Sequence, residues 1–339
     1  MLNEKQLKEL SVLNWSSLAK DFSGEDLLLG NGFSINLVGN FKYRSLFEEF
    51  LKRCEPSARR IFKSFGTNNF ELIQEILINA KKVNELFKIG TNQRIDEAIE
   101  LLKNGLIESI RNNHPSRSLI DWNQLQQLSV QLNNFRDIFT LNYDLFLYHI
   151  ILKMKDKADI ENRIAPYSDY FWGGKPDEQF KQFMDYDNIH PKYIYYLHGA
   201  LFIFKIPPDT FKLRKGDDPK ELVEMIRDVI STGILPLFVS EGNYKEKLKA
   251  INRSSYLSFC YEALEQRNNK LVIFGSSLSA QDTHIVNAIN QNKNRRELAI
   301  AIHIGNKSKD ELEREMKSLK AKFKFHKIYF FDSETIFKF

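Results

Sequence analysis

Four short polar segments carry the residue types that could bind a nucleotide and act on it. Each follows directly on a short apolar run, and in chain order they are Gly30-Asn31-Gly32-Phe33-Ser34, Thr140-Leu141-Asn142-Tyr143-Asp144, His198-Gly199 and Gly275-Ser276-Ser277. Glycine lets the backbone approach a phosphate closely, while hydroxyl, amide and imidazole groups can orient a sugar or a water molecule and move a proton. Together the segments predict a site for a phosphate-bearing ligand with groups suited to acid–base chemistry.

The first segment has glycines at positions 30 and 32 and a hydroxyl at Ser34. A glycine loop that opens a helix can hold a phosphate on backbone N–H groups, so we expect Gly30, Asn31, Gly32, Phe33 and Ser34 to bind one. It is not the dehydrogenase G-x-G-x-x-G pattern, because no glycine follows three residues after Gly32. An ordinary turn with Ser34 as a helix cap remains the alternative.

The second and third segments place Asn142, Asp144 and His198 immediately after apolar runs. Asn142 and Asp144 are candidates for catalysis, with Thr140 and Tyr143 beside them as binding residues. His198 is a candidate proton acceptor, since the reference pKa of histidine is about 6.5. The alternatives are capping of the loop by the Asn and Asp side chains, and a histidine satisfied within the core.

The fourth segment offers Gly275, Ser276 and Ser277 to a phosphate or ribose, with Asp282 and His284 just downstream. Asp282 is included among the candidate binding residues. The serines could equally cap the following helix, with Asp282 and His284 on its first turn.

The elements that must position these segments are short apolar runs of parallel-strand type. They span residues 27–29, 138–141, 193–197, 271–274, 298–304 and 327–331, and the fifth ends at Gly305-Asn306. In open α/β sheets, ligands bind outside the carboxyl ends of the strands. We therefore predict an α/β fold with a Rossmann-like parallel sheet flanked by helices, and a shared crevice that also receives Gly305 and Asn306.

Residues 45–135 differ in texture, because glycine is rare and apolar residues recur every three or four positions. This pattern predicts an all-helical insertion. The whole of 1–339 is expected to form one domain, with its nucleotide-binding α/β core in 20–45, 136–155, 190–240 and 265–339.

The composition is that of an ordinary globular protein, with 42% hydrophobic and 27% charged residues and a net charge of +5. No run approaches the roughly 20 apolar residues of a membrane span, and the first residues lack the apolar centre of a secretory signal, so a cytoplasmic location is expected. Lys293, Arg295 and Arg296 form a basic stretch that is better explained as a solvated helix end than as a nucleic-acid patch. Because Cys54 and Cys260 are the only cysteines and lie far apart in the sequence, we expect neither a disulfide framework nor a thiolate metal site.

The ordered set G-N-G-F-S, T-L-N-Y-D, L-H-G and F-G-S-S-L closely resembles the motifs of the sirtuin superfamily. With N-Y-D followed by S-S-L-S-x-x-D-x-H-I, the chain is similar to the sirtuin-like NADase domains of bacterial anti-phage defence systems, some of which are encoded beside a HerA-type hexameric ATPase. The resemblance covers roughly 25–45, 136–150, 190–205 and 265–306. Unlike protein-deacylating sirtuins, this chain lacks the two C-x-x-C pairs of a structural zinc module, which counts against peptide deacylation.

The resemblance implies an enzyme that cleaves the nicotinamide–ribose bond of NAD to give nicotinamide and ADP-ribose. Asn142 would orient the water and the ribose hydroxyls, Asp144 would lie near the nicotinamide amide, and His198 would accept a proton. The glycine loop at 30–34 would hold the pyrophosphate, and 275–277 would close over the nucleotide, with Gly305 and Asn306 at the adenosine end.

NAD is thus the expected substrate, with no metal cofactor. The implied role is NAD depletion in antiviral defence, by a homo-oligomer with a HerA-type ATPase as a candidate partner and without direct nucleic-acid or membrane binding. The alternatives are a non-catalytic sensor or scaffold that binds NAD or ADP-ribose, an NAD-dependent deacylase or ADP-ribosyl transferase and, last, a DNA-binding protein.

Overall fold

A computed structural model gives the fold of most of the chain. It describes residues 4–37, 46–54, 56–113, 121–160, 166–174, 178–187, 189–215, 221–239, 242–324 and 326–338. Residues 38–45, the end of the first predicted core segment, lie outside these ranges.

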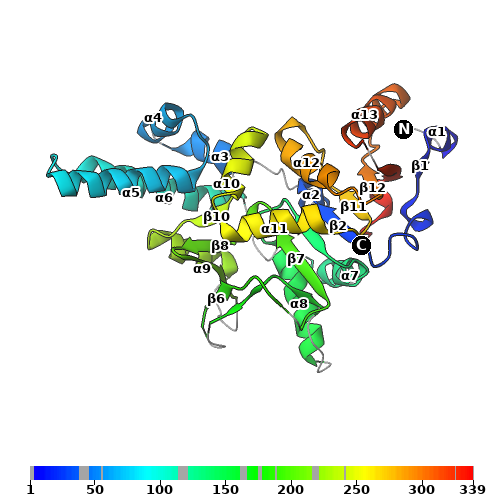
Figure 1. The fold of residues 1–339 in the computed structure, drawn as a ribbon, viewed down its shortest axis with the longest axis horizontal. Helices are drawn as coiled ribbons and strands as arrows, with labels where there is room; N and C mark the ends of the chain where they lie inside the picture. The colour runs from blue at the N-terminus through cyan, green and yellow to red at the C-terminus, as the bar shows by residue number, and fades with distance from the viewer. Residues whose placement is uncertain are drawn as a thin grey trace.

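The centre of the molecule is an eight-stranded sheet in which neighbouring strands are parallel (Figure 1). Across the sheet the strands are β1 (Val12–Leu13), β13 (Lys327–Asp332), β12 (Glu297–Ile302), β11 (Leu271–Phe274), β2 (Asp26–Leu29), β3 (Ile138–Thr140), β7 (Lys192–Tyr196) and β4 (Tyr167–Ser168). The predicted α/β fold with a Rossmann-like parallel sheet is confirmed.

The six inner strands have the order of a doubly wound fold. Starting from β2, the chain adds β3 and β7 on one side and then returns to place β11, β12 and β13 on the other, which gives the order 3-2-1-4-5-6. The direction reverses between β2 and β11, where Leu29 is paired with Phe274. In such sheets the crevice at the carboxyl ends of the two strands at this switch point receives the ligand.

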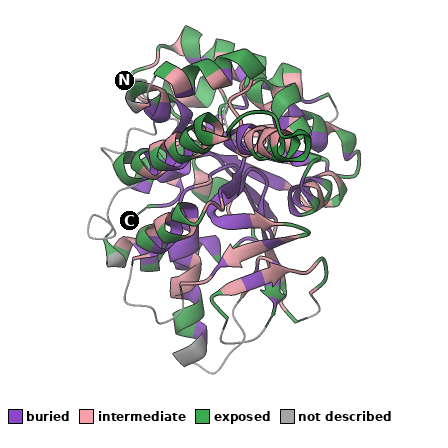
Figure 2. Cartoon of the chain, turned by 90° about the vertical axis from the view of Figure 1, so that its left-hand side faces the viewer, coloured by how far each residue is buried: buried purple, intermediate pink, exposed green. Residues whose placement is uncertain are grey.

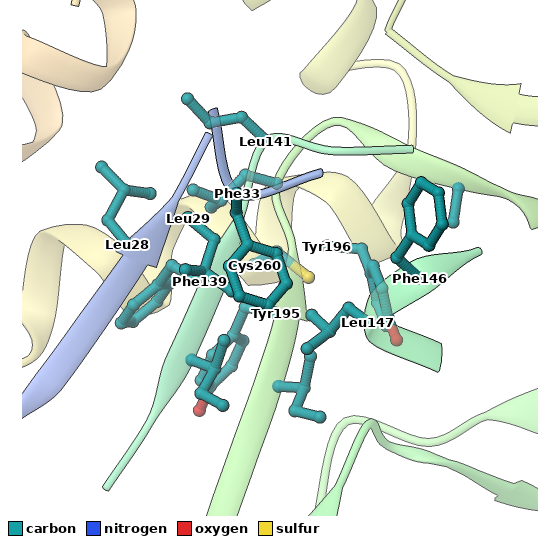
Figure 3. Packing of buried hydrophobic residues seen from close by; sticks show 14 of the residues in the cluster. Leu28, Leu29, Phe33, Phe139, Leu141, Phe146, Leu147, Tyr195, Tyr196 and Cys260 are labelled. Carbon is teal, nitrogen blue, oxygen red and sulfur yellow. The ribbon is translucent and has the colours of Figure 1, made fainter. Parts of the chain in front are cut away.

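The sheet is buried on both faces, as its apolar strands require (Figure 2). All four residues of β2 and of β11 are buried. Aromatic rings fill much of the space beside β3 and β7, where Phe139 and Tyr195 stack with their centroids 4.8 Å apart (Figure 3).

Helices flank the sheet and connect its strands. They are α1 (Glu4–Glu9), α2 (Asn31–Leu37), α8 (Phe146–Ile160), α9 (Leu222–Ser231), α10 (Tyr244–Ile251), α11 (Ser255–Gln266), α12 (Thr283–Gln291) and α13 (Lys309–Lys322), with short 3-10 turns at Trp15–Ser17, Ala280–Asp282 and Ser333–Thr335. Among the described residues, no helix is both long and apolar enough to cross a membrane.

Between β2 and β3 the described residues are helical. The helices are α3 (Leu46–Arg53), α4 (Pro56–Phe65), α5 (Phe70–Phe87), α6 (Gln93–Asn113) and α7 (Trp122–Leu132). Edge-to-face contacts among Phe47, Phe50, Phe62 and Phe70 join α3, α4 and α5, with ring centroids 5.0 to 5.9 Å apart. The long pair α5 and α6 projects away from both sheets (Figure 1).

A second sheet, which the sequence did not predict, lies beside the first. It is antiparallel, with the order β10 (Pro236–Phe238), β8 (Gly199–Ile206), β9 (Asp209–Leu213), β6 (Phe180–Phe183) and β5 (Phe171–Gly173). Within 190–240, which the sequence predicts as part of the nucleotide-binding core, β7 belongs to the parallel sheet and β8, β9 and β10 belong to the second sheet. The two sheets meet at Gly199, which has φ +68° and directly follows His198.

In the stretch 293–296, predicted to be solvated, Lys293 and Arg296 are exposed but Arg295 is not. Arg295 has no exposed surface and its Nη2 lies 3.2 Å from Oδ2 of Asp26, itself fully buried at the start of β2. A buried ion pair of this kind occupies the guanidinium, so Arg295 serves the fold and is not available to a nucleic acid.

Candidate functional site

A cavity of about 200 Å³ opens at the switch point, beyond the carboxyl ends of β2, β3, β7 and β11. Its lining comes from every one of the four predicted polar segments and from α10. The lining residues are Gly30, Asn31, Leu141, Tyr143, His198, Val239, Lys247, Gly275, Ser276, Ser277, Ser279, Gln281 and Asp282. The convergence expected from strand order is thus present in the structure.

Two glycine loops interlock at the floor of this cavity. The Gly32 N–H donates to the Gly275 carbonyl over 2.8 Å, and Gly275 itself has φ +72°. A Cβ added to Gly275 would lie 2.5 Å from the Phe33 nitrogen, and one added to Gly32 would lie 2.6 Å from the Gly275 Cα. Packing of the two loops against each other therefore accounts for these glycines before any ligand is considered.

A buried hydrogen-bonded network ties the second polar segment to the first. Asn142 Nδ2 donates to the Gly30 carbonyl and to Ser34 Oγ, each over 3.0 Å. Ser34 in turn donates to Asp144 Oδ2 over 2.5 Å, and Asp144 Oδ1 accepts the Phe146 N–H over 3.0 Å. Asn142 Oδ1 is buried and has no hydrogen-bond partner among the described residues, so it is the one acceptor that this network leaves open.

Asp144 of this network is buried, with 5% of its surface exposed. Burial raises the pKa of Asp144 to about 6, in spite of the hydrogen bonds from Ser34 and Phe146 that lower it. Desolvation disfavours the charged form of a carboxyl group, which explains the direction. Asp144 is mostly ionised at pH 7 and becomes neutral below about pH 6.

Two imidazoles face each other at the wall of the cavity. His198 follows β7 and lies 2.9 Å, Nε2 to Nε2, from His284 on the first turn of α12. The Leu141 backbone favours the protonated form of the His198 ring, but burial outweighs this effect. His284 Nδ1 is buried and has no hydrogen-bond partner within the described part of the chain.

Both imidazoles are held in the neutral form. Burial, the neighbouring His284 and the charge of Lys247 keep the pKa of His198 well below its usual range. Burial and Lys247 lower the pKa of His284 to about 4. At neutral pH each ring therefore has a lone pair that can accept a proton or bind a cation.

A buried cation completes the wall and was not foreseen from the sequence. Lys247 on α10 places its Nζ 2.8 Å from Asp282 Oδ1, and both residues line the cavity. The segment Tyr-Lys-Glu-Lys-Leu-Lys-Ala-Ile has the interspersed charges of a solvated helix, so no local pattern marks its fourth residue, Lys247, as buried. The packing of α10 against α11, α12 and the 3-10 turn at Ala280–Asp282 buries this lysine.

The structure places the predicted residues in three groups. Those that line the cavity are Gly30, Asn31, Tyr143, His198, Gly275, Ser276, Ser277 and Asp282. Those that stand next to it without lining it are Gly32, Phe33, Ser34, Thr140, Asn142 and Asp144. Those that lie apart are Gly305 and Asn306, which follow β12 and are separated from β2 by β11.

Three of the predicted binding residues that stand next to the cavity contact other parts of the protein. The ring of Phe33 packs edge to face on Phe274 and Phe337, and Thr140 accepts the Asn142 N–H in the buried network. The Ser34 hydroxyl donates to Asp144. In this conformation these side chains shape the loops, and a phosphate would meet Asn31, Ser276 and Ser277 in their place.

Comparison with known proteins finds one matching family model, described as Domain of unknown function (DUF4917), which covers residues 27–337. The match therefore covers the six inner strands except for Asp26, the whole second sheet and every residue that lines the cavity, while β1 lies before it. No curated protein matches the chain.

Proposed function

This chain belongs to the DUF4917 family, and we propose that it is an NAD hydrolase that cleaves the nicotinamide–ribose bond. The observation that carries the proposal is that His198 lines the switch-point cavity together with Gly30, whose carbonyl is bound to the Asn142–Ser34–Asp144 network directly behind it. A pocket that only held a pyrophosphate would need neither a neutral imidazole nor a buried amide with an open acceptor. The sequence resemblance to sirtuin-like NADases supports the same assignment.

The proposed reaction is a displacement at the ribose C1′ through an oxocarbenium-like transition state. Nicotinamide leaves with the electron pair of the C–N bond and departs neutral, so its departure requires no acid. A water molecule adds to C1′ from the other face and gives up one proton, which yields nicotinamide, ADP-ribose and a proton. The protein has to hold the ribose, stabilise the developing positive charge and position the water.

His198 is the proposed proton acceptor. Its low pKa keeps the ring neutral over the physiological range, and the residue lines the cavity with its Nε2 2.9 Å from His284 Nε2. In the proposed complex a ribose hydroxyl or the attacking water takes the place of His284 on that nitrogen. The proton then passes to His198 as the new C–O bond forms.

The Asn142–Asp144 network supplies orientation and charge. Asn142 Oδ1 is the open acceptor and can orient a water molecule or a ribose hydroxyl, while Nδ2 stays bonded to Gly30 and Ser34. Asp144 does not line the cavity, so we assign it the task of holding Ser34 and Asn142 in place and of placing negative charge near the oxocarbenium. Asn31, Ser276 and Ser277 are the proposed contacts of the pyrophosphate.

We further propose that the protein works as an assembly, in keeping with its resemblance to defence NADases. Leu86, Phe87 and Ile89 at the end of the α5–α6 pair are more than half exposed, as 76%, 68% and 56% of their surfaces face solvent. Adjacent apolar side chains at a projecting tip are typical of a contact surface. A second copy of the chain is the proposed occupant, and NAD depletion against phage, with a HerA-type ATPase as a further partner, is the proposed setting.

The deciding experiment follows nicotinamide and ADP-ribose by chromatography after incubation of the purified chain with NAD. We expect the wild type to form nicotinamide and ADP-ribose in equal amounts. His303→Ala, which removes an exposed imidazole, should do so at the same rate. His198→Ala should lose nearly all turnover. Binding of NAD or ADP-ribose without turnover in the wild type would reject the hydrolase and favour a sensor.

A further inference from the structure

Three side chains in the cavity wall present ligand atoms to one point. One nitrogen each from His198 and His284 and one carboxylate oxygen from Asp282 all lie within 4.8 Å of one another. We propose that these three residues form a binding site for a divalent transition-metal ion of the Zn²⁺ type. Two imidazoles and one carboxylate are a frequent ligand set for such ions, which leave a fourth position for water.

The two histidines already have the spacing that a metal ion requires. Their Nε2 atoms are 2.9 Å apart, and two Zn–N bonds of about 2.05 Å at a tetrahedral angle separate the nitrogens by roughly 3.3 Å. A shift of a few tenths of an ångström would therefore admit the ion. Without an ion, one shared hydrogen occupies the contact; with one, each ring gives its Nε2 lone pair and carries its hydrogen on Nδ1.

The surroundings of His198 fit the same arrangement. The Leu141 backbone favours a proton on the His198 ring. In the proposed complex Nδ1 would carry that proton while Nε2 binds the ion, since metal-binding histidines typically donate their second N–H to a backbone carbonyl or a carboxylate. The contact with His284 already places His198 Nε2 toward the second ligand. His284 is held from the other side, because Tyr261 Oη donates to the His284 carbonyl over 2.8 Å.

Asp282 supplies the third ligand and connects the site to the cavity. Its Oδ1 accepts a hydrogen bond from Lys247 Nζ, which leaves Oδ2 for the ion. A ligating carboxylate is itself commonly hydrogen-bonded in this way. Because Asp282 and His198 both line the cavity, water can fill the fourth position from there.

Lys247 sets the strength of the site. Its ammonium group is buried beside all three ligands and lowers the pKa of both histidines by its charge. The same charge repels a divalent cation, so the site should bind reversibly and not as a permanent structural metal. Replacing this lysine by an uncharged side chain should tighten metal binding.

Metal binding would stop the proposed reaction, a consequence that rests on the proposed function. An ion on His198 Nε2 uses the lone pair that would accept the proton. Zinc would then act as a reversible inhibitor that the hydrolase releases when the free ion falls.

The test is titration of the chelator-stripped full chain with ZnCl₂ by calorimetry, in the absence of NAD. We expect one Zn²⁺ per chain, at least a hundredfold weaker binding by His284→Ala, and unchanged binding by the control His303→Ala. Lys247→Met should bind at least tenfold more tightly, since the loss of the repelling charge outweighs the loss of the hydrogen bond to Asp282. No binding by the wild type, or equal binding by the wild type and His284→Ala, would overturn the proposal.

Two further arms separate the possible failures. If His284→Ala does not fold, Asp282→Asn carries the same test, with circular dichroism to establish folding. Added Zn²⁺ should inhibit NAD hydrolysis by the wild type and by His303→Ala, because both proteins are expected to bind the ion. If the wild type binds zinc but does not turn over NAD, only the proposed hydrolase is rejected. If the wild type turns over NAD but binds no zinc and is not inhibited by it, only the metal site is rejected.

Discussion

Asn142 Nδ2 donates to Ser34 Oγ over 3.0 Å, and this bond joins two loops that are 108 residues apart in the sequence. Because Nδ2 also reaches the Gly30 carbonyl, one amide group holds the first glycine loop against the loop that follows β3. Asn142 therefore has a stabilising role that its position in the sequence does not reveal. Its effect on turnover has to be separated from its effect on the fold.

Asn142→Ala should lower both stability and turnover. The free energy of unfolding should fall by about 2–3 kcal/mol, because the buried Gly30 carbonyl and Ser34 hydroxyl each lose a partner. The rate of NAD hydrolysis should fall a few hundredfold with the loss of the open acceptor Oδ1. Denaturant unfolding and single-substrate kinetics measure the two effects.

Asn290→Ala is the matched control for this substitution. Asn290 is a half-buried amide on α12 that donates to the Lys322 carbonyl, away from the cavity. Its loss should cost about 1 kcal/mol and leave turnover as in the wild type. Equal loss of turnover in both variants would mean that stability alone explains the effect of Asn142.

Gly275→Ala should destabilise the protein far more than Gly24→Ala. Both glycines have a positive φ, +72° and +77°, so both variants lose about 1–2 kcal/mol to backbone strain. Only at Gly275 would the new Cβ also meet backbone atoms, the nearest 2.5 Å away, whereas nothing lies within 4 Å at Gly24. Urea unfolding should show an additional loss of at least about 2 kcal/mol for Gly275→Ala, and similar losses for both would show that the loops separate easily.

The parallel sheet could be predicted because its strands are buried apolar runs that each end in a polar loop. The antiparallel sheet could not, because a strand such as β8 (Gly199–Ile206) is as apolar as those of the parallel sheet. What separates them is the turn at Gly199, where a Cβ would lie 2.1 Å from the Leu237 carbonyl oxygen. That contact depends on tertiary packing and leaves no periodic pattern.

The sequence predicted the residues of the candidate site better than it predicted their arrangement. Strand order brings Gly30, His198 and Gly275 to one cavity, as expected. The contact between His198 and His284 joins residues 86 positions apart, and the burial of Lys247 depends on how α10 packs. Neither follows from local residue types, so the sequence suggested a histidine base but not its partner or the nearby charge.

Asp144→Asn should change how stability depends on pH. The pKa of Asp144 is about 6 in the folded protein and 3.8 for an ordinary aspartate, so between these values the folded state binds a proton that the unfolded state lacks. Folding is therefore favoured as the pH falls through 6, and this contribution fades as the pH rises above 6. Asp144→Asn has no titrating carboxyl group at this position and therefore lacks this pH-dependent contribution to stability.

The measurement is the free energy of unfolding of both proteins at pH 7.5 and at pH 5. The wild type should gain about 1 kcal/mol relative to Asp144→Asn over this interval. Using the difference between the two proteins cancels the titration of all other groups. A difference that stays constant, or that moves in the other direction, would show that Asp144 is not held in a desolvated environment.

The double substitution Leu86→Glu and Phe87→Glu should prevent self-association without affecting the fold. Both side chains are at the projecting end of the α5–α6 pair and are largely exposed, so the substitutions should change the free energy of unfolding by less than about 0.5 kcal/mol. Like charges placed at a self-contact repel each other and cost several kcal/mol. Light scattering coupled to size exclusion should show an oligomer for the wild type and a monomer for the variant, and Val130→Glu, an exposed apolar position on α7, should remain oligomeric. A monomeric wild type, or a variant that assembles equally well, would place any self-contact elsewhere on the molecule.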